Sequence, residues 1–244
     1  MIYYLGDSFF FGWNFIRFSI PNRKESIFSH LLSEKLGCEY KNLSIPGSSN
    51  YRLCRLVNFL DIKKDDIVIL GWSACERIEI GIPKDTLLPN DFVVDYNNID
   101  NLDSHSWIKI MQLVEKTGNI YTRQIYPTMM RNLDRVTSPN TRKATELFYH
   151  YASDIPYHQQ MFKILFNSAV HRLRTIGCKF LMTTTWDVEF EDKEFLNIPE
   201  YLFYKSNLAA EVRGKGDNIN ERDLPYFSIK EHEVAADILY QYLK

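Results

Sequence analysis

Three short runs near the amino end, each typical of a strand and followed by a small-residue break, alternate with two amphipathic helical segments. This alternation is the feature that most constrains the fold. The runs cover residues 2–5, 42–45 and 66–70, and the chain then breaks at Gly6, Gly47 and Gly71. The helical segments, 26–36 and 51–60, each carry one apolar face, with Gly37 ending the first and Asn50 able to cap the second. Short elements in this order predict right-handed βαβ units and a parallel sheet.

The carboxyl-terminal part of the chain returns to the same pattern. A helix is predicted from about 157 to 176, followed by a strand at 178–183. The last helix opens at Ser228, where Glu231 completes a capping box and His232 falls in the first turn. We therefore predict an α/β fold, a three-layer α/β/α sandwich around a central, mostly parallel sheet of the flavodoxin type.

Residues 77–157 interrupt the alternation with five prolines and many Asn, Asp and aromatic residues. Two parts of this stretch, 106–114 and 141–152, contain no helix breaker and have apolar residues at mixed helical spacing. So long a connection inside a compact domain usually has a function. We interpret it as a helical insert in a single domain of residues 1–244, lying over the carboxyl ends of the strands, where a substrate would bind. Completing the core or a dimer contact is the alternative.

Composition limits the function classes. The chain has 244 residues and a formal net charge of −2, which gives no long-range attraction to nucleic acid or to an anionic membrane. No apolar run approaches the roughly 20 residues of a membrane span, and the amino end lacks the pattern of a signal peptide. The four cysteines show no CxxC pairing, and zinc, Walker and Rossmann patterns are lacking. We expect a soluble, cytoplasmic protein without metal or cofactor, its oligomeric state left open.

The residues after the predicted strands carry the candidate chemistry. Asp7 and Ser8 follow the first strand, Gly47 lies in the loop after the second, and Ser73 follows the third. Open α/β sheets place ligands and catalysis at the carboxyl ends of their strands. A serine at a strand-to-loop break can expose its hydroxyl as a nucleophile, and neighbouring backbone N–H groups can stabilise an oxyanion.

This order of blocks resembles the SGNH hydrolases, the GDSL-like esterases and lipases, over about residues 1–80 and 178–244. The resemblance implies Ser8 as the nucleophile, with the backbone N–H groups of Ser8 and Gly47 as oxyanion donors. It implies Ser73 as the third donor, where the family has an asparagine. The chain also looks like uncharacterised SGNH-like proteins of bacteriophages and some bacteria, and a phage origin would make association with a virion an alternative location.

The last family block, an Asp-x-x-His pair before the final helix, differs in this chain. One alignment places Asp223 on the family's aspartate and Tyr226 on its histidine, and a second alignment places Leu224 on the histidine. A tyrosine with an ordinary pKa near 10 is a poor base at neutral pH. A replacement base would have to come from the last helix or the insert, and the candidates are His232, His105, His150 and His158.

Other side chains could line the pocket, and these are Asp7, Asn50, Trp72, Arg77 and Tyr226. Two of them have a simpler alternative: Asn50 could cap its helix, and Arg77 could pair with the neighbouring Glu76 and Glu79. Two functions follow. The first is a serine hydrolase that cleaves an ester, such as an O-acyl group on a carbohydrate. The second is a catalytically inactive member that binds a glycan or a protein partner.

Overall fold

The computed structural model describes residues 1–12, 23–82, 114–117, 120–125, 139–184, 194–202, 207–215 and 227–244. Four parallel strands form its main sheet in the order β2-β1-β3-β7. Their bounds are Ile2–Leu5 for β1, Tyr40–Asn42 for β2, Ile67–Trp72 for β3 and Lys179–Thr184 for β7. Tyr201 adds a single parallel bridge to Met182 on the outer side of β7. The predicted α/β fold with a central parallel sheet is confirmed.

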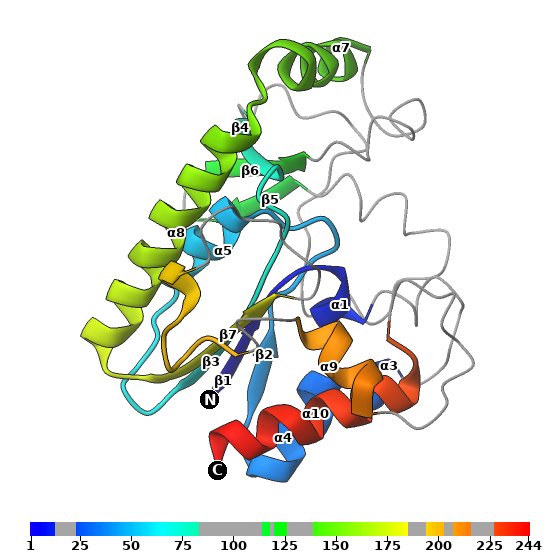
Figure 1. Ribbon diagram of the computed structural model, residues 1–244, viewed down its shortest axis with the longest axis vertical. Coiled ribbons are helices and arrows are strands. Elements are labelled where there is room, and N and C mark those ends of the chain that lie inside the picture. Colours follow the sequence, from blue (N-terminus) through cyan, green and yellow to red (C-terminus); the bar gives the residue numbers. More distant parts are fainter. Residues whose placement is uncertain are drawn as a thin grey trace.

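Helices cover both faces of the main sheet (Figure 1). On one face lie α3 (Arg23–Ser26), α4 (Phe28–Leu36), α9 (Leu208–Lys215) and α10 (Ile229–Leu243). On the other lie α5 (Asn50–Phe59) and α8 (Ile155–Ile176). Two short pieces complete this part, α1 (Ser8–Phe11) and a 3-10 turn at Glu194–Leu196. No helix in the described ranges is long and apolar enough to cross a membrane.

The apolar strands are explained by burial on both faces. Successive side chains of a strand point to opposite faces, so Ile2 and Tyr4 pack against the α4 and α10 side. Tyr3 and Leu5 pack against the α5 and α8 side. A parallel strand covered by helices on both faces needs an apolar residue at nearly every position. This is why the runs can be read from the sequence.

The helix ends follow the sequence with one correction. Gly37 and Gly177 end α4 and α8 in the left-handed conformation, and Ser228 and Glu231 form the predicted capping box of α10. Asn50, the predicted cap of α5, does not cap it. The cap is Ser49, whose hydroxyl accepts from the backbone N–H of Arg52 at 3.2 Å. Asn50 is the first helical residue, and its side chain is used elsewhere.

The strand predicted to break at Gly71 does not break there. Gly71 lies inside β3, opposite Thr183 of β7, and the strand continues to Trp72. A glycine is needed because the ring of Phe10, from α1, occupies the space where its side chain would be. Phe9, Phe10 and Phe11 are all buried, so this aromatic run belongs to the core.

The insert contains a second sheet that the sequence did not predict. Three antiparallel strands, β4 (Ile78–Ile82), β6 (Ile120–Ile125) and β5 (Val114–Thr117), pair in that order. Residues 141–152 are helical as predicted, within α7 (Pro139–Leu147) and a π-helical turn at Phe148–Ala152. Val114, predicted to end a helix, begins β5 instead, and 106–113 lie outside the described residues.

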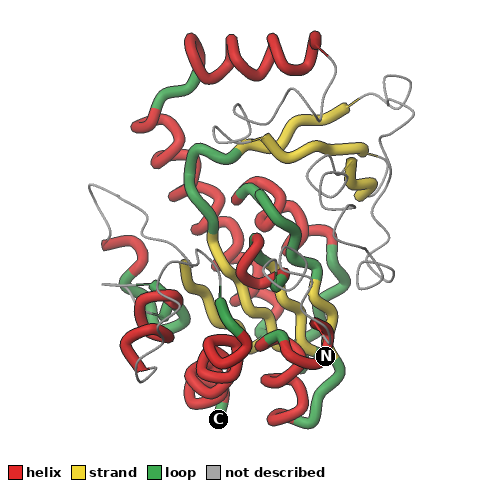
Figure 2. Tube along the Cα trace, turned by 90° about the vertical axis from the view of Figure 1, so that its right-hand side faces the viewer, coloured by secondary structure: helices red, strands yellow, loops and turns green. Residues whose placement is uncertain are grey.

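This antiparallel sheet lies beyond the carboxyl ends of the main strands in both views (Figures 1 and 2). Buried ion pairs join it to α5. Arg52 contacts Glu115 of β5 through two nitrogens, at 2.6 and 3.2 Å. Arg55 contacts Glu79 of β4 in the same two-pronged way and also reaches Glu115. The insert is therefore attached to the helix that begins at the candidate site.

Candidate functional site

The candidate site lies where β1 and β3 end side by side. The chain leaves β1 toward β2 on one side, and β7 pairs with β3 on the other. In open α/β sheets the crevice at such a reversal of strand order is where ligands bind. Residues 6–8 follow β1, and residues 73–77 connect β3 to β4. The predicted blocks around Ser8 and Ser73 therefore meet at the topological switch point.

Asp7 and Ser8 open the short helix α1. Asp7 is its N-cap: the carboxylate accepts from the N–H of Phe9 at 3.1 Å and is fully buried. The second carboxylate oxygen lies 3.3 Å from Nη1 of Arg77. Ser8 is the first helical residue and 6% exposed, and its hydroxyl makes no hydrogen bond within the described part of the chain. The Ser8 hydroxyl therefore has no hydrogen-bond partner among the described residues, whereas the carboxylate of the preceding Asp7 has two.

The loop after β2 packs against the end of β1. The N–H of Ile45 donates to the carbonyl of Gly6 at 3.2 Å, which brings this loop beside the first block. Gly47 has a φ of 75°, a left-handed backbone that glycine adopts without strain. The hydroxyl of the next residue, Ser48, is buried and has no hydrogen-bond partner among the described residues. The loop therefore brings a glycine and an unsatisfied hydroxyl to the neighbourhood of Ser8.

Asn50 and Ser73 are joined by two hydrogen bonds. The Asn50 amide nitrogen donates to the Ser73 carbonyl at 2.9 Å, and the Ser73 N–H donates to the Asn50 amide oxygen at 2.8 Å. Both residues are 1% exposed. Asn50 thus does not cap its helix, and its side chain fixes the backbone of Ser73 to the start of α5.

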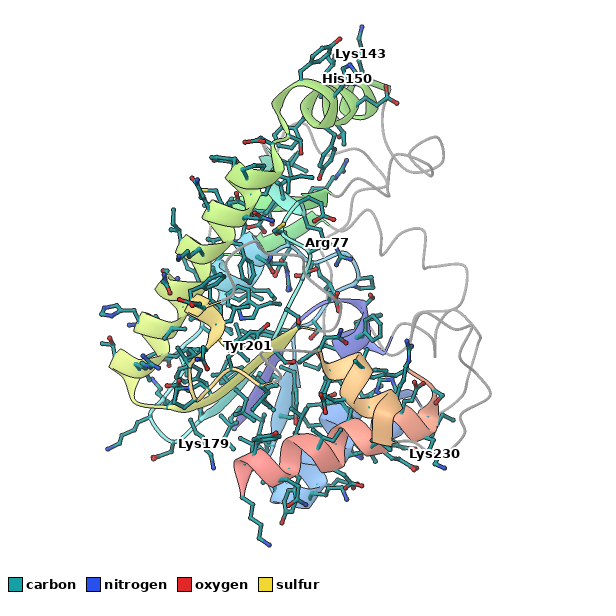
Figure 3. The ribbon with its side chains drawn as sticks, in the orientation of Figure 1. Arg77, Lys143, His150, Lys179, Tyr201 and Lys230 are labelled. Atoms are coloured by element: carbon teal, nitrogen blue, oxygen red, sulfur yellow. The ribbon has the colours of Figure 1, made fainter. Side chains whose placement is uncertain are left out.

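Arg77 connects the segment after β1, which carries Asp7, with the segment after β3, which carries Ser73. Its Nη1 atom donates to the Ser73 hydroxyl at 2.5 Å and reaches Asp7 at 3.3 Å. The sequence offered a local pair with Glu76 or Glu79, but Glu79 pairs with Arg55. The labelled Arg77 in Figure 3 lies between the main sheet and the antiparallel sheet. A permanently charged group thus occupies the centre of the site.

Side chains from the insert complete the surroundings of Arg77. The hydroxyl of Tyr149, from the π-helical turn, donates to the backbone carbonyl of Glu76 at 3.1 Å, and burial raises its pKa. Burial and then the Glu76 carboxylate raise the pKa of Cys75 to about 11, so this thiol is not a nucleophile at neutral pH. Sequence reasoning missed Tyr149, because only the chain path of the insert brings it beside the connection between β3 and β4.

The candidate histidines lie in different surroundings. His232 is fully buried, stacks on Phe28 and accepts from the Phe28 N–H at 3.3 Å through Nδ1. It is a core residue of the α4 and α10 face. His150 is exposed in the π-helical turn, far from Arg77 (Figure 3). His105 lies outside the described residues.

His158 is linked to the site through the electrostatic effect of Glu76 on its pKa. It is 1% exposed near the start of α8, and its Nε2 atom hydrogen-bonds the Ser153 hydroxyl at 3.0 Å. Burial lowers its pKa, while the carboxylates of Glu76 and Asp154 act in the opposite direction. The imidazole is therefore neutral at neutral pH.

Trp72, another predicted pocket residue, belongs to the core. Trp72 is fully buried against Phe162 and Phe166 in the core below α8. Asp223, Leu224 and Tyr226 lie outside the described residues. The described ranges hold no group of three or more His, Cys, Asp or Glu side chains able to bind a metal ion.

No known family model, curated protein or solved structure matches the chain. A function for this site therefore has to follow from its geometry and its residues.

Proposed function

We propose that this chain is a serine esterase of the SGNH type, with Ser8 as its nucleophile. The observation that carries the proposal is the Ser8 hydroxyl, which lies at the switch point and makes no hydrogen bond among the described residues. The residue before it, Asp7, pairs with Arg77, and Arg77 also donates to the Ser73 hydroxyl. An O-acyl group on a carbohydrate is the proposed substrate class, taken from the sequence resemblance.

The proposed reaction has two halves. The Ser8 oxygen bonds to the ester carbonyl carbon while its proton passes to a base, and the carbonyl oxygen becomes an oxyanion. The N–H groups of Ser8 and Gly47 and the hydroxyl of Ser73 would stabilise that charge. The ester C–O bond then breaks, and the alcohol leaves with the proton from the base. Water attacks the acyl-enzyme and gives a proton to the base. The bond between the acyl carbon and the Ser8 oxygen then breaks, the base returns the proton to that oxygen, and the carboxylic acid leaves.

His158 is the base we propose to test first. A neutral buried imidazole can accept a proton near pH 7, and the field of Glu76 reaches it. Its Nε2 atom is bonded to Ser153, whereas its Nδ1 atom is buried without a hydrogen-bond partner among the described residues, so Nδ1 is the nitrogen that would accept the proton. His232 is a poor candidate because Nδ1 already accepts from the Phe28 backbone inside the core.

A catalytically inactive protein that binds a glycan or a protein partner is the second candidate. One observation favours it: within the described residues, no histidine is hydrogen-bonded to Ser8. Proton transfer to a general base needs such a contact in the reactive complex. The two functions differ in whether Ser8 reacts with electrophiles.

Labelling with a fluorophosphonate probe separates them. We expect the folded wild type to be labelled, with the label mapped to the Ser8 peptide by mass spectrometry, and the labelling to be lost in Ser8→Ala. His158→Gln should slow it strongly, whereas a folded His232→Gln variant should retain it. Heat-unfolded wild type is the control for non-specific reaction. A folded wild type that stays unlabelled from neutral to mildly alkaline pH would instead select the binding function.

A further inference from the structure

We propose that Arg77 is a positioning residue that orients and polarises the Ser73 hydroxyl as an oxyanion donor. This inference rests on the proposed esterase function. It assigns Arg77 neither substrate binding nor a proton to transfer. Its role is to decide where the single proton of Ser73 points.

The direction of the Arg77–Ser73 hydrogen bond follows from chemistry. A guanidinium has only donors, and a serine hydroxyl has one proton and two acceptor lone pairs. In their 2.5 Å contact, Ser73 must therefore be the acceptor. Its proton remains available for a different acceptor, in a direction away from the guanidinium.

Three contacts fix the position of that hydroxyl. Asn50 holds the Ser73 N–H at 2.8 Å and the Ser73 carbonyl at 2.9 Å, which fixes the backbone. Arg77 holds the side-chain oxygen, which fixes the rotamer. A donor held in place before the reaction avoids reorganisation when the oxyanion forms, and such preorganised donors contribute most to electrostatic catalysis.

The Asp7 carboxylate fixes Arg77 in turn. The same Nη1 atom that donates to Ser73 lies 3.3 Å from Asp7, which is fully buried directly before the nucleophile. A hydroxyl that accepts from a charged donor becomes a better donor itself, because hydrogen bonds in a chain polarise one another. The geometry therefore connects the Ser8 segment to its oxyanion donor through one charged group.

Hydrolysis of p-nitrophenyl acetate tests the proposal. The rate of the Ser8→Ala variant is subtracted, so that only Ser8-dependent turnover is compared. We expect Ser73→Ala and Arg77→Met each to lower kcat about a hundredfold, the usual effect of losing one oxyanion donor, with KM changed less than about threefold. The double variant should lose no more than either single one, because both changes act on one hydrogen bond. Arg174→Met, which removes an exposed bidentate pair with Glu200, is the matched control and should leave kcat unchanged.

Two further measurements separate positioning from folding. Arg77→Lys keeps a cation beside the buried Asp7 but lacks the guanidinium fork, so it should fold and still lose about tenfold in kcat. Trifluoroacetone is a ketone whose carbonyl carbon is attacked by a serine hydroxyl to give a hemiketal oxyanion. Its affinity for these variants should fall in proportion to their loss of kcat. A purely structural role would lower thermal stability without this parallel.

Specific outcomes would overturn the inference. If Ser73→Ala keeps the wild-type kcat, or if the losses of the two single variants multiply in the double variant, Arg77 does not act through Ser73. These outcomes leave Ser8-dependent turnover intact, so the proposed function survives them. If Ser8→Ala hydrolyses the ester as fast as wild type, the proposed function fails, and the role of Arg77 fails with it.

Discussion

The ring of Phe10 fills the space that a side chain at Gly71 would need. A Cβ atom added to Gly71 would lie well under 3.0 Å from three atoms of this ring, and one added to Gly6 would lie under 3.0 Å from two ring atoms and the Cβ atom of Phe10. The ring thus lies between the ends of β1 and β3, directly behind the segment that carries Ser8. The two glycines are therefore required by packing at the base of the candidate site.

Gly71→Ala should destabilise the protein strongly. The added methyl group must displace a fully buried ring, and overpacking of a filled core costs about 1–3 kcal/mol or more. We expect a loss of about 3 kcal/mol in the free energy of unfolding, measured by urea denaturation. Gly81→Ala in β4 is the control, because no atom of the described residues lies within 4 Å of the position that its new methyl group would take. This control should change stability by less than about 0.5 kcal/mol. Similar losses in both variants would contradict the prediction.

The main sheet could be predicted because its strands are buried on both faces. Runs such as residues 2–5 and 67–72 are apolar at nearly every position, and helix ends such as Gly177 and the Ser228–Glu231 box have local signals. The prediction at Gly71 was wrong for a physical reason. A glycine that ends a strand and a glycine that makes room for a distant ring look the same in sequence.

The antiparallel sheet could not be predicted because charged side chains occupy buried positions in it. Glu115 and Arg123 are each 4% exposed, so β5 and β6 show no apolar alternation. What compensates Glu115 is Arg52, a residue of α5 far away in the sequence. Such partners become apparent only when the chain is folded, since a buried charge needs a specific partner and not a pattern.

In the site, positions were predictable and partners were not. Ser8 and Ser73 follow β1 and β3 as predicted. The second strand is Tyr40–Asn42 and not residues 42–45, so Gly47 lies in a longer loop after β2 than was predicted. The Arg77–Asp7 ion pair and the two hydrogen bonds between Asn50 and Ser73 join segments that are distant in the sequence. The sequence around Arg77 and Asn50 looks the same as that of an ordinary local ion pair or a helix cap.

Asn50→Ala should remove the two hydrogen bonds that hold the Ser73 backbone. The Ser73 N–H and carbonyl would both lose this partner inside the protein, at about 1–3 kcal/mol for each unsatisfied group. We expect a loss of about 3 kcal/mol in urea denaturation, together with slower fluorophosphonate labelling of Ser8. Asn58→Ala, at an exposed position of the same helix, should change stability little, because alanine is the better helix former. Equal changes in the free energy of unfolding at the two positions would show that the hydrogen bonds between Asn50 and Ser73 do not stabilise the protein.

Glu115→Gln should weaken the attachment of the insert to α5, where the pair between Arg55 and Glu79 remains. Glu115 lies between Arg52 and Arg55, and the Arg52 side chain is fully buried, so the substitution takes a carboxylate away from a buried guanidinium. Losing one partner of a buried pair typically costs about 3–5 kcal/mol. Asp61→Asn makes the same chemical change in a pair with Lys63 that is largely exposed, where a loss under about 1 kcal/mol is expected. Urea midpoints that shift equally in the two variants would rule out a stabilising role for the buried pair.

His158 should make the stability of the protein fall at acidic pH. Burial lowers its pKa, so the unfolded chain binds a proton at a higher pH than the folded chain does. As the pH falls below about 6.5, the unfolded state is protonated first, and the free energy of unfolding decreases. Above about pH 7 the imidazole is mostly neutral in both states, and the contribution is nearly constant.

His158→Gln removes this titration and keeps a polar side chain near Ser153. Urea denaturation between about pH 5 and pH 8 should therefore show the wild type losing stability relative to the variant as the pH is lowered, with a constant difference above about pH 7. His171→Gln, at an exposed position of the same helix, controls for the loss of an imidazole as such. Parallel profiles for wild type and His158→Gln over the whole range would mean that His158 binds its proton equally in the folded and unfolded chains, and would remove the argument that it is held neutral for proton transfer.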